Sequence, residues 1–195
     1  MVYFKIMNCK FILSLLFLSF ISANIFATDL KVTNITKTDK NINIEFNNNL
    51  TLCNFISDNN SLISPYYENK GTKYYYFHFL NRNFKNYIIE QIKSDTVQFP
   101  KNDKNIEYKI NKCNIVKNPK KVFAFMSIIF NNTVEVQCNI MKGDYGLWVA
   151  WPSVKEKDKW NKLFTIKDNE LKKDIESALI KFYKQKRDKQ NISQK

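Results

Sequence analysis

Four lysines and one tryptophan gather in a short segment of the second half of the chain, where they could bind phosphate groups and stack on a base. These residues are Lys155, Lys157, Lys159, Trp160 and Lys162. Ammonium groups contact the phosphates of nucleic acids, and an indole beside them can stack on an unpaired base. Lysines also populate ordinary solvated surfaces, so the segment predicts either a polyanion-binding surface or a merely soluble one.

A second set of basic residues lies on one side of an expected helix near the C-terminus. Asp168 or Asn169 is positioned to cap that helix, and Glu170 suits its first turn because acidic groups stabilise the positive end of the helix dipole. An apolar stripe at roughly 100° per residue predicts the buried face, with Leu171, Ile175, Ala178, Leu179 and Phe182. The other side, which we expect near the first set, carries Lys173, Lys181, Lys184 and Arg187. After Lys184 the apolar period stops, which predicts a frayed tail.

The sequence contains no arrangement typical of a catalytic, metal or cofactor site. Its single histidine, His78, lies between Phe77 and Phe79 in an expected strand, a position more typical of a structural residue. No serine or cysteine has a histidine base near it in the sequence, and neither a glycine-rich phosphate loop nor a paired-carboxylate motif occurs. We therefore expect a non-enzymatic binding protein without a cofactor or metal.

Three cysteines follow the N-terminal apolar segment, namely Cys53, Cys113 and Cys138. Their spacing does not suggest a zinc site. If the strands that carry Cys113 and Cys138 are neighbours, a disulfide could join them in an oxidising compartment. The alternative is that both are buried as small apolar residues.

One pattern of apolar residues occurs twice. Six positions recur at a constant separation of 87, in the pairs Pro65 and Pro152, Phe77 and Phe164, Phe79 and Ile166, Phe84 and Leu171, Ile88 and Ile175, Ile92 and Leu179. Upstream the separation is 84, from Ile44, Phe46, Leu50 and Leu52 to Ile128, Phe130, Val134 and Val136, and 78 from Val32 to Ile110. The shifts fall at hairpin loops, where insertions cost little. We infer a tandem duplication, with chance similarity in a biased composition as the alternative.

Each copy begins with antiparallel strands and ends in a helix, which predicts an α+β fold. Alternating residues predict one hairpin over 42–52 and its counterpart over 122–136. We expect 147–151 to be a strand that is not a solvated edge strand, because both of its faces are apolar. We expect 74–79 to be one strand, whose outer face the companion copy covers. The helix of the first copy is expected over 81–94, with Phe84, Ile88 and Ile92 inward.

The N-terminal segment 1–27 predicts export. Lys5 and Lys10 precede an uncharged run to Ala27, the pattern of a secretory signal peptide, or of a signal anchor if it is not cleaved there. The remainder divides into a first copy at 28–95, a linker at 96–107, a second copy at 108–187 and a basic tail at 188–195. It keeps a formal net charge of +11, because residues 1–27 carry two lysines and no acid. Such a charge favours polyanionic partners.

The second half, about residues 108 to 184, resembles the septation protein SpoVG (stage V sporulation protein G) family. The closest correspondence is Gly146-Leu147-Trp148-Val149-Ala150-Trp151-Pro152-Ser153, which matches the family signature Gly-Leu-aromatic-Val-Ala-x-Pro-Ser. The other matching segments are 108–110, the hairpin 125–136, a basic loop at 155–159, a short strand at 164–166 and a helix at 171–183. The first half looks like a diverged copy, with Ser61-Leu62-Ile63-Ser64-Pro65-Tyr66-Tyr67 in place of the signature.

The resemblance implies a small antiparallel sheet with a C-terminal helix, dimerisation, and regulatory binding of DNA or RNA linked to septation and sporulation. A tandem copy would supply the second subunit internally, so we expect an intramolecular pseudo-dimer. Family members are ordinarily single cytosolic domains, whereas this chain carries a duplicate and an export signal. The signal favours an alternative, an exported interaction module that binds an anionic envelope polymer, a membrane surface, a protein partner or a second copy of itself. If the signal is not used, the protein is cytoplasmic.

Overall fold

A computed structural model describes residues 30–58, 61–94 and 105–192 of the chain, and its fold is α+β. The expected export segment lies outside these residues. The first half runs β1 (Val32–Lys37), β2 (Ile42–Phe46), β3 (Leu50–Asp58), β4 (Ser61–Ile63), β5 (Tyr66–Asn69), β6 (Thr72–Tyr75), β7 (Phe77–Phe79) and α2 (Arg82–Lys93). The second half runs β8 (Tyr108–Ile115), β9 (Val122–Phe130), β10 (Val134–Gly143), β11 (Gly146–Ala150), β12 (Ser153–Glu156), β13 (Lys159–Lys162), β14 (Phe164–Ile166) and α3 (Asn169–Ile192). The order of elements is therefore the same in both halves.

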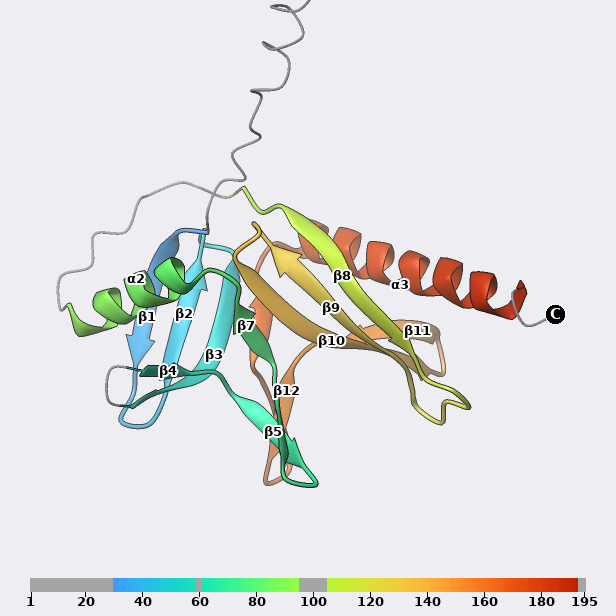
Figure 1. The fold of residues 1–195 in the computed structure, drawn as a ribbon, viewed down its shortest axis with the longest axis horizontal. Helices are drawn as coiled ribbons and strands as arrows, with labels where there is room; N and C mark the ends of the chain where they lie inside the picture. Colours follow the sequence, from blue (N-terminus) through green and yellow to red (C-terminus); the bar gives the residue numbers. More distant parts are fainter. Residues whose placement is uncertain (1–29, 59–60, 95–104, 193–195) are drawn as a thin grey trace, which may run out of the picture.

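Two antiparallel sheets form the body of the molecule, one from each half (Figure 1). The first has the order β1-β2-β3-β14 with β4 also on β3, and the second has the order β11-β10-β9-β8 with β7 also on β10. Two further hairpins, β5–β6 and β12–β13, stand apart from both sheets. Buried residues of both halves make one continuous hydrophobic cluster, so the two sheets share a core.

The two sheets exchange one short strand each. Strand β7 from the first half pairs with β10, and places Phe77 opposite Val136. Strand β14 from the second half pairs with β3, and places Phe164 opposite Leu52. Phe77 and Phe164 are 87 positions apart, and their partners Leu52 and Val136 are 84 positions apart. These are the separations of the sequence repeat, so the two exchanged strands pair in the same register. Each sheet is thus completed by the other half of the chain.

Strand pairing corrects one of the expected correspondences. Val32 lies opposite Phe46, whereas Tyr108 lies opposite Phe130. Tyr108, and not Ile110, is therefore the positional counterpart of Val32. The expected separation of 78 was wrong because each edge strand contains its own irregularity, between Val32 and Asn34 and between Ile110 and Lys112.

Both helices begin at capped positions close to those expected. The Asn81 side chain accepts hydrogen bonds from the N–H groups of Asn83 and Phe84, and Asp168 does the same for Glu170 and Leu171. Helix α2 packs against β4 and β7, and α3 packs against β8, β10, β11 and β14. Ile88 and Ile92 of α2 are buried, and Phe84 is half-buried.

The apolar face of α3 differs from the expectation at its C-terminal end. Ile175 and Leu179 are fully buried, and Leu171 is half-buried. Phe182, expected in the core, is 39% exposed, and Tyr183 is buried in its place. The buried residues Ile175, Leu179 and Tyr183 follow steps of four, which rotates the stripe around the helix by about 40° per step, and the helix continues to Ile192. Residues 185–192 are therefore helical, which contradicts the expected fraying after Lys184.

The expected strand 74–79 is two strands separated at Tyr76. The Tyr76 N–H donates to the Pro65 carbonyl at 3.0 Å, and its own carbonyl accepts from the Gln137 N–H at 2.9 Å. The chain therefore leaves the β5–β6 hairpin at Tyr76 and enters the second sheet. Strand β11, expected not to be a solvated edge strand, lies at the edge of the second sheet. Its apolar character is explained by α3, which packs against it.

Cys113 and Cys138 are free thiols buried on strands that are not neighbours. Both lie opposite Met126 of β9, so β9 separates them. Burial raises the pKa of Cys113 and raises that of Cys138 to about 12. The structure agrees with the second of the two expectations, burial as small apolar residues.

None of the helices in residues 30–58, 61–94 and 105–192 combines the length and the apolar character that crossing a bilayer requires.

Candidate nucleic-acid interface

The lysine–tryptophan segment forms a two-stranded hairpin that projects from the body of the molecule (Figure 1). Lys155 lies directly opposite Trp160 across the hairpin, and Ser153 lies opposite Lys162. Since directly opposite residues share a face and alternate residues point the same way, Lys155, Trp160 and Lys162 lie on one face. We call these three residues the lysine–indole face.

The remaining two lysines of the predicted cluster do not belong to that face. Lys159 lies opposite Glu156 on the other side of the hairpin, where an acid offsets its charge. The Glu156 carboxylate also accepts a hydrogen bond from the Asn161 side chain at 2.6 Å. Lys157 occupies the turn with a left-handed backbone, at φ 54°. The structure therefore divides the predicted cluster into a face, a turn and an opposite side.

Trp160 is accessible to a ligand. Its side chain is 67% exposed, whereas Trp151, nine positions earlier, packs on Phe164 with ring centroids 5.0 Å apart. Trp151 also donates from its indole nitrogen to Glu176 at 2.7 Å. Among the described residues, no ring contact is made by Trp160. An exposed indole between two ammonium groups can stack on a base whose phosphates those groups contact.

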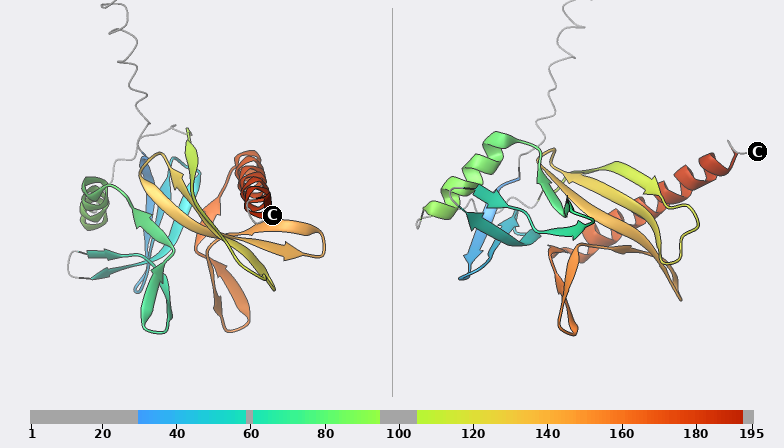
Figure 2. Two further views of the ribbon diagram at one scale, coloured as in Figure 1. Left: turned by 45° about the vertical axis from the view of Figure 1, so that its right-hand side comes forward. Right: turned by 60° about the horizontal axis from the view of Figure 1, so that its bottom comes forward.

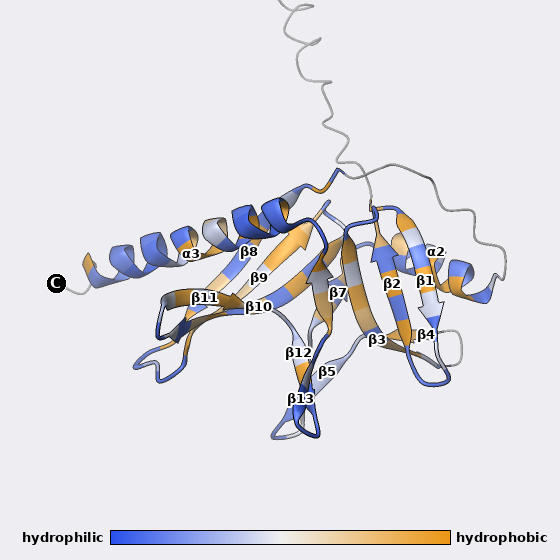
Figure 3. Ribbon diagram, turned by 180° about the vertical axis from the view of Figure 1, so that it is seen from behind, coloured by the Kyte–Doolittle hydropathy of each residue, from blue (hydrophilic) through white to orange (hydrophobic). Residues whose placement is uncertain are grey.

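The basic residues of α3 are exposed, as expected, and lie on a different element. Lys173, Lys181 and Lys184 are all exposed. Arg187 pairs with Asp188 at 3.0 Å and lies over the Tyr183 ring at 5.8 Å. Figure 1 shows α3 and the β12–β13 hairpin pointing in different directions, and β14 separates the two elements in the chain. Hydrophilic residues cover the outward side of α3 (Figure 3). The two basic sets lie on different elements, the β12–β13 hairpin and α3, and their action as one surface stays a prediction.

The β5–β6 hairpin adds an aromatic surface that sequence reasoning did not identify. Tyr66, Tyr67 and Tyr74 are 37%, 44% and 44% exposed, so the companion half does not cover them. Tyr67 and Tyr74 stack across the hairpin with ring centroids 5.0 Å apart. Lys73 lies over the Tyr66 ring at 4.6 Å. The signal was present in the sequence as two tyrosine pairs on either side of Lys70-Gly71, a dipeptide typical of a tight turn.

The two hairpins project from the same side of the molecule (Figures 1 and 2). One carries the lysine–indole face and the other carries the exposed tyrosines. Basic and aromatic side chains in this combination suit a single strand of nucleic acid, whose backbone is anionic and whose bases are planar.

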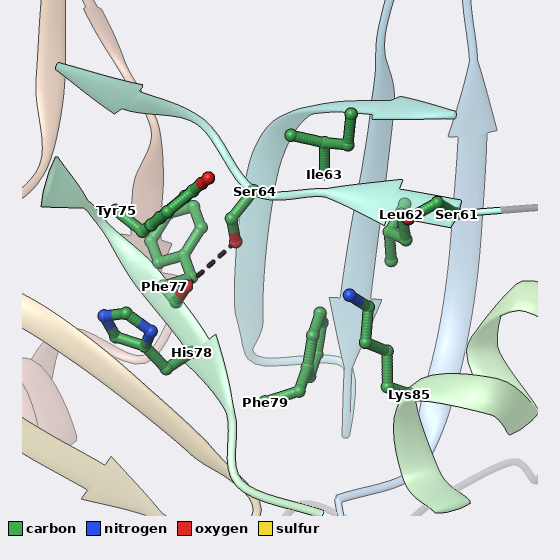
Figure 4. A pocket seen from close by; sticks show the side chains of 9 residues that line it. All are labelled: Ser61, Leu62, Ile63, Ser64, Tyr75, Phe77, His78, Phe79 and Lys85. Atoms are coloured by element: carbon green, nitrogen blue, oxygen red, sulfur yellow. Dashed lines mark hydrogen bonds between the residues drawn. The ribbon is translucent and has the colours of Figure 1, made fainter. Parts of the chain in front are cut away.

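A cavity of about 340 Å³ lies at the base of the β5–β6 hairpin, between β4, β7 and α2 (Figure 4). Leu62, Ile63, Phe77 and Phe79 supply apolar walls, and Ser61, Ser64, Tyr75, His78 and Lys85 supply polar groups. The Ser64 hydroxyl donates to the Phe77 carbonyl at 2.9 Å. The Lys85 ammonium extends from α2 into the cavity (Figure 4). This cavity combines apolar walls with one cation.

His78 lies opposite Glu135, a carboxylate that is only 5% exposed. Burial alone would raise the pKa of Glu135, but four neighbours outweigh burial and lower it, namely Ser127, Asn111, Lys112 and His78. Asn111 donates to the carboxylate at 2.8 Å, and Lys112 lies 3.9 Å from it. Glu135 is therefore a charged group held inside the second sheet.

Within the described part of the chain, no three histidine, cysteine, aspartate or glutamate side chains gather as a metal site would require. Comparison with protein-family models, with curated proteins and with solved structures finds no match to this chain.

Proposed function

We propose that this protein binds single-stranded nucleic acid through the lysine–indole face, and that it acts by binding and not by catalysis. The observation that carries the proposal is the placement of Lys155, Trp160 and Lys162 on one face of a projecting hairpin, with the indole 67% exposed. The formal net charge of +13 for the whole chain attracts polyanions in general. The exposed lysines of α3 and Arg187 provide a second, weaker surface for phosphate.

We also propose that the chain is a tandem duplication folded as an intramolecular pseudo-dimer. The reciprocal exchange of β7 and β14 supports this, since each strand fills the same position in the opposite sheet. Corresponding backbone hydrogen bonds add support, from Tyr76 to Pro65 in one half and from Leu163 to Pro152 in the other. Exchanged strands of this kind occur where two copies of one domain associate, and a covalent link makes that association permanent.

The SpoVG-like signature of the second half suggests the cellular process in which the binding takes part. If the resemblance reflects descent, this protein is a nucleic-acid-binding regulator linked to septation, cell division or sporulation. The first half lacks the signature and has an aromatic hairpin where the second has a basic one. We propose that the two halves contact different parts of the nucleic acid. The second half contacts the phosphates, and the first half makes additional contacts with the bases.

The test is binding of a single-stranded oligonucleotide as a function of salt concentration, measured by fluorescence anisotropy. Lys155→Gln with Lys162→Gln should weaken binding and lower the slope of log affinity against log salt by about 0.7 for each phosphate that the protein no longer neutralises. Trp160→Ala should weaken binding by about 1–3 kcal/mol and leave that slope nearly unchanged, because stacking releases no counterions.

The matched control is Lys159→Gln, a lysine of the same hairpin on the opposite side beside Glu156. It should change the slope less than either lysine of the face. Absence of any salt-dependent binding by the wild-type protein would refute the proposed function. Equal effects of all three lysine substitutions would refute the assignment to one face.

A second candidate function is an exported module that binds an anionic envelope polymer, a membrane surface or a protein partner. The sequence of residues 1–27 favours it. Fractionation of cells that express the tagged protein, with sequencing of its N-terminus, separates the two candidates. A cytosolic protein that begins at Met1 would exclude the exported module, and a processed protein outside the cytosol would favour it.

A further inference from the structure

The cavity at the base of the β5–β6 hairpin corresponds to a position that an indole fills in the other half. Ser64 is the counterpart of Trp151, and Phe77 is the counterpart of Phe164, at a separation of 87 positions in both cases. Trp151 packs on Phe164 with ring centroids 5.0 Å apart. Ser64 is too small to reach across the same space. Phe55 packs on Phe77 with ring centroids 5.6 Å apart, and a cavity of about 340 Å³ is lined by Ser64, Phe77 and Phe79.

The charges around the cavity differ from those around Trp151 in one informative way. In the second half Lys172 lies 3.9 Å from Glu176, one turn further along α3, and Glu176 also accepts from the Trp151 indole. The counterparts in α2 are Lys85 and Ile89. The carboxylate is therefore missing while the lysine is kept. Among the described residues, Lys85 forms no ion pair.

We propose that this cavity binds one nucleotide unit of the single strand, with the base between the partly exposed rings of Tyr75 and Phe79 and the phosphate at Lys85. A planar ring matches the space that the indole occupies in the other half. An anionic group matches the lysine that lacks its acid. A nucleotide unit carries both features at the separation of one sugar, and Ser64, Tyr75 and His78 offer hydrogen-bonding groups for the edge of the base. The proposal rests on the proposed function, because it names how one base of the same strand is held.

The location of the cavity supports a strand that continues from the hairpins. Tyr75 ends β6 and lines the cavity, and its ring lies 5.4 Å from that of Tyr66 across the hairpin, so a base held there would be next to the exposed Tyr66. Recognition of single strands ordinarily uses bases splayed out and packed on aromatic side chains. The cavity would add selectivity to a surface that otherwise contacts backbone and stacks on any base.

The decisive variant is Ser64→Trp, which places in the first half the residue that the second half already contains. The indole should fill the cavity, so the variant is expected to fold. The experiment compares the affinity of each protein for an oligonucleotide with that for the same oligonucleotide carrying abasic sites. Ser64→Trp should lower the wild-type preference for the intact strand by about 5- to 150-fold, the factor expected when one base no longer stacks. Lys85→Gln, which leaves the packing intact, should weaken binding of both strands.

The matched control is Asn34→Trp, which adds an exposed tryptophan on β1, far from the cavity in sequence and in the sheet order. It should leave the preference unchanged. An unchanged preference in Ser64→Trp, with salt-dependent binding intact, would overturn the cavity proposal and leave the proposed function standing. If Ser64→Trp does not fold, the effect of Lys85→Gln on a free nucleotide decides the matter.

Titration with adenosine monophosphate, followed by NMR shifts of His78 and neighbouring residues, tests the cavity without the hairpin lysines. The wild type and the Lys155→Gln, Lys162→Gln variant should bind it equally, and Ser64→Trp and Lys85→Gln should not. If the nucleotide binds in this pattern but the wild-type protein shows no salt-dependent binding of oligonucleotides, the proposed function is refuted and the cavity is still a nucleotide site. Shifts caused by N-acetyltryptophan and not by the nucleotide would overturn the proposal in favour of an aromatic peptide.

Discussion

Asn47 and Asn131 donate their side-chain amides to the same acceptor, the backbone carbonyl of Asn105, at 2.9 and 3.5 Å. The two asparagines are buried and occupy corresponding turns with left-handed backbones, at φ 50° and 44°. Each also accepts a hydrogen bond from the N–H of an entering strand, Lys31 at 2.6 Å and Glu107 at 3.1 Å. A single carbonyl therefore connects the corresponding turns of the two halves.

Replacing Asn47 with aspartate should destabilise the protein by about 1–3 kcal/mol. The carboxylate keeps the acceptor for Lys31 but cannot donate to the Asn105 carbonyl, and it places a negative charge beside that carbonyl at a fully buried position. Urea unfolding measures the change. The matched control is Asn48→Asp, at φ 52° but exposed, which should stay within about 0.5 kcal/mol of the wild type. Equal destabilisation of the two variants would contradict the role of the shared carbonyl.

Replacing Ile175 with alanine should cost about 2–5 kcal/mol, because the side chain is fully buried between α3 and the second sheet. Phe182→Ala, seven residues along the same helix, should cost much less because that ring is 39% exposed. Thermal or urea unfolding of both variants gives the comparison. A larger destabilisation at Phe182 than at Ile175 would show that the opposite side of the helix faces the core.

The stability of the protein should depend on the ionisation of Glu135 in the acid range. The pKa of this group is lowered on folding, so its stabilising contribution is present above the unfolded value, near 4.5, and disappears as the pH falls through the folded value. Glu135→Gln should destabilise the protein at neutral pH, and the difference from wild type should shrink as the pH decreases. Glu68→Gln, on the exposed β5–β6 hairpin, is the control and should leave the acid dependence unchanged. A constant difference between pH 7 and pH 3 would contradict the prediction.

Cys113 and Cys138 should remain unmodified and unlinked in the folded protein. Burial raises the pKa of both thiols, to about 12 for Cys138, so little reactive thiolate forms at neutral pH. A chromogenic disulfide reagent should label them only after denaturant is added, and mild oxidation should leave the mass of the protein without an internal disulfide. Above pH 9 stability should fall, because the unfolded chain then releases the thiol proton more easily than the folded one. A Cys113–Cys138 disulfide under native conditions would show that β9 does not separate them.

Periodicity and spacing predicted both helices and the main hairpin of each half, β2–β3 and β9–β10. The caps at Asn81 and Asp168 and the buried residues Ile88, Ile175 and Leu179 follow from local rules that act within a few residues. Tyr183 replaces Phe182 in the core because the stripe drifts along a helix that is longer than its apolar period indicated. Local pattern alone does not reveal that drift.

Long-range hydrogen bonds determined the features that the pattern missed. The break at Tyr76 interrupts an aromatic alternation that would suit a continuous strand, and its partners are Pro65 and Gln137. The division of the lysine cluster depends on a turn at Lys157 that sets which residues lie opposite each other. Ser64 lines the cavity at the position where the second half has Trp151, a difference that becomes informative only once the two halves are compared.

A ribosome finishes the first half of this chain long before the strand that completes its sheet exists. The edge of β3 at Leu50–Leu52 stays unpaired until β14 has been synthesised. The Asn49 side chain likewise lacks its hydrogen-bond donor, the Asp168 N–H, until the chain is 119 residues longer. An unpaired strand edge is a template for pairing with another chain. During synthesis, other nascent chains on the same messenger RNA can therefore pair with the open edge of β3 before the C-terminal half of the same chain supplies β14. The order in which the strands are made sets how long that edge stays open.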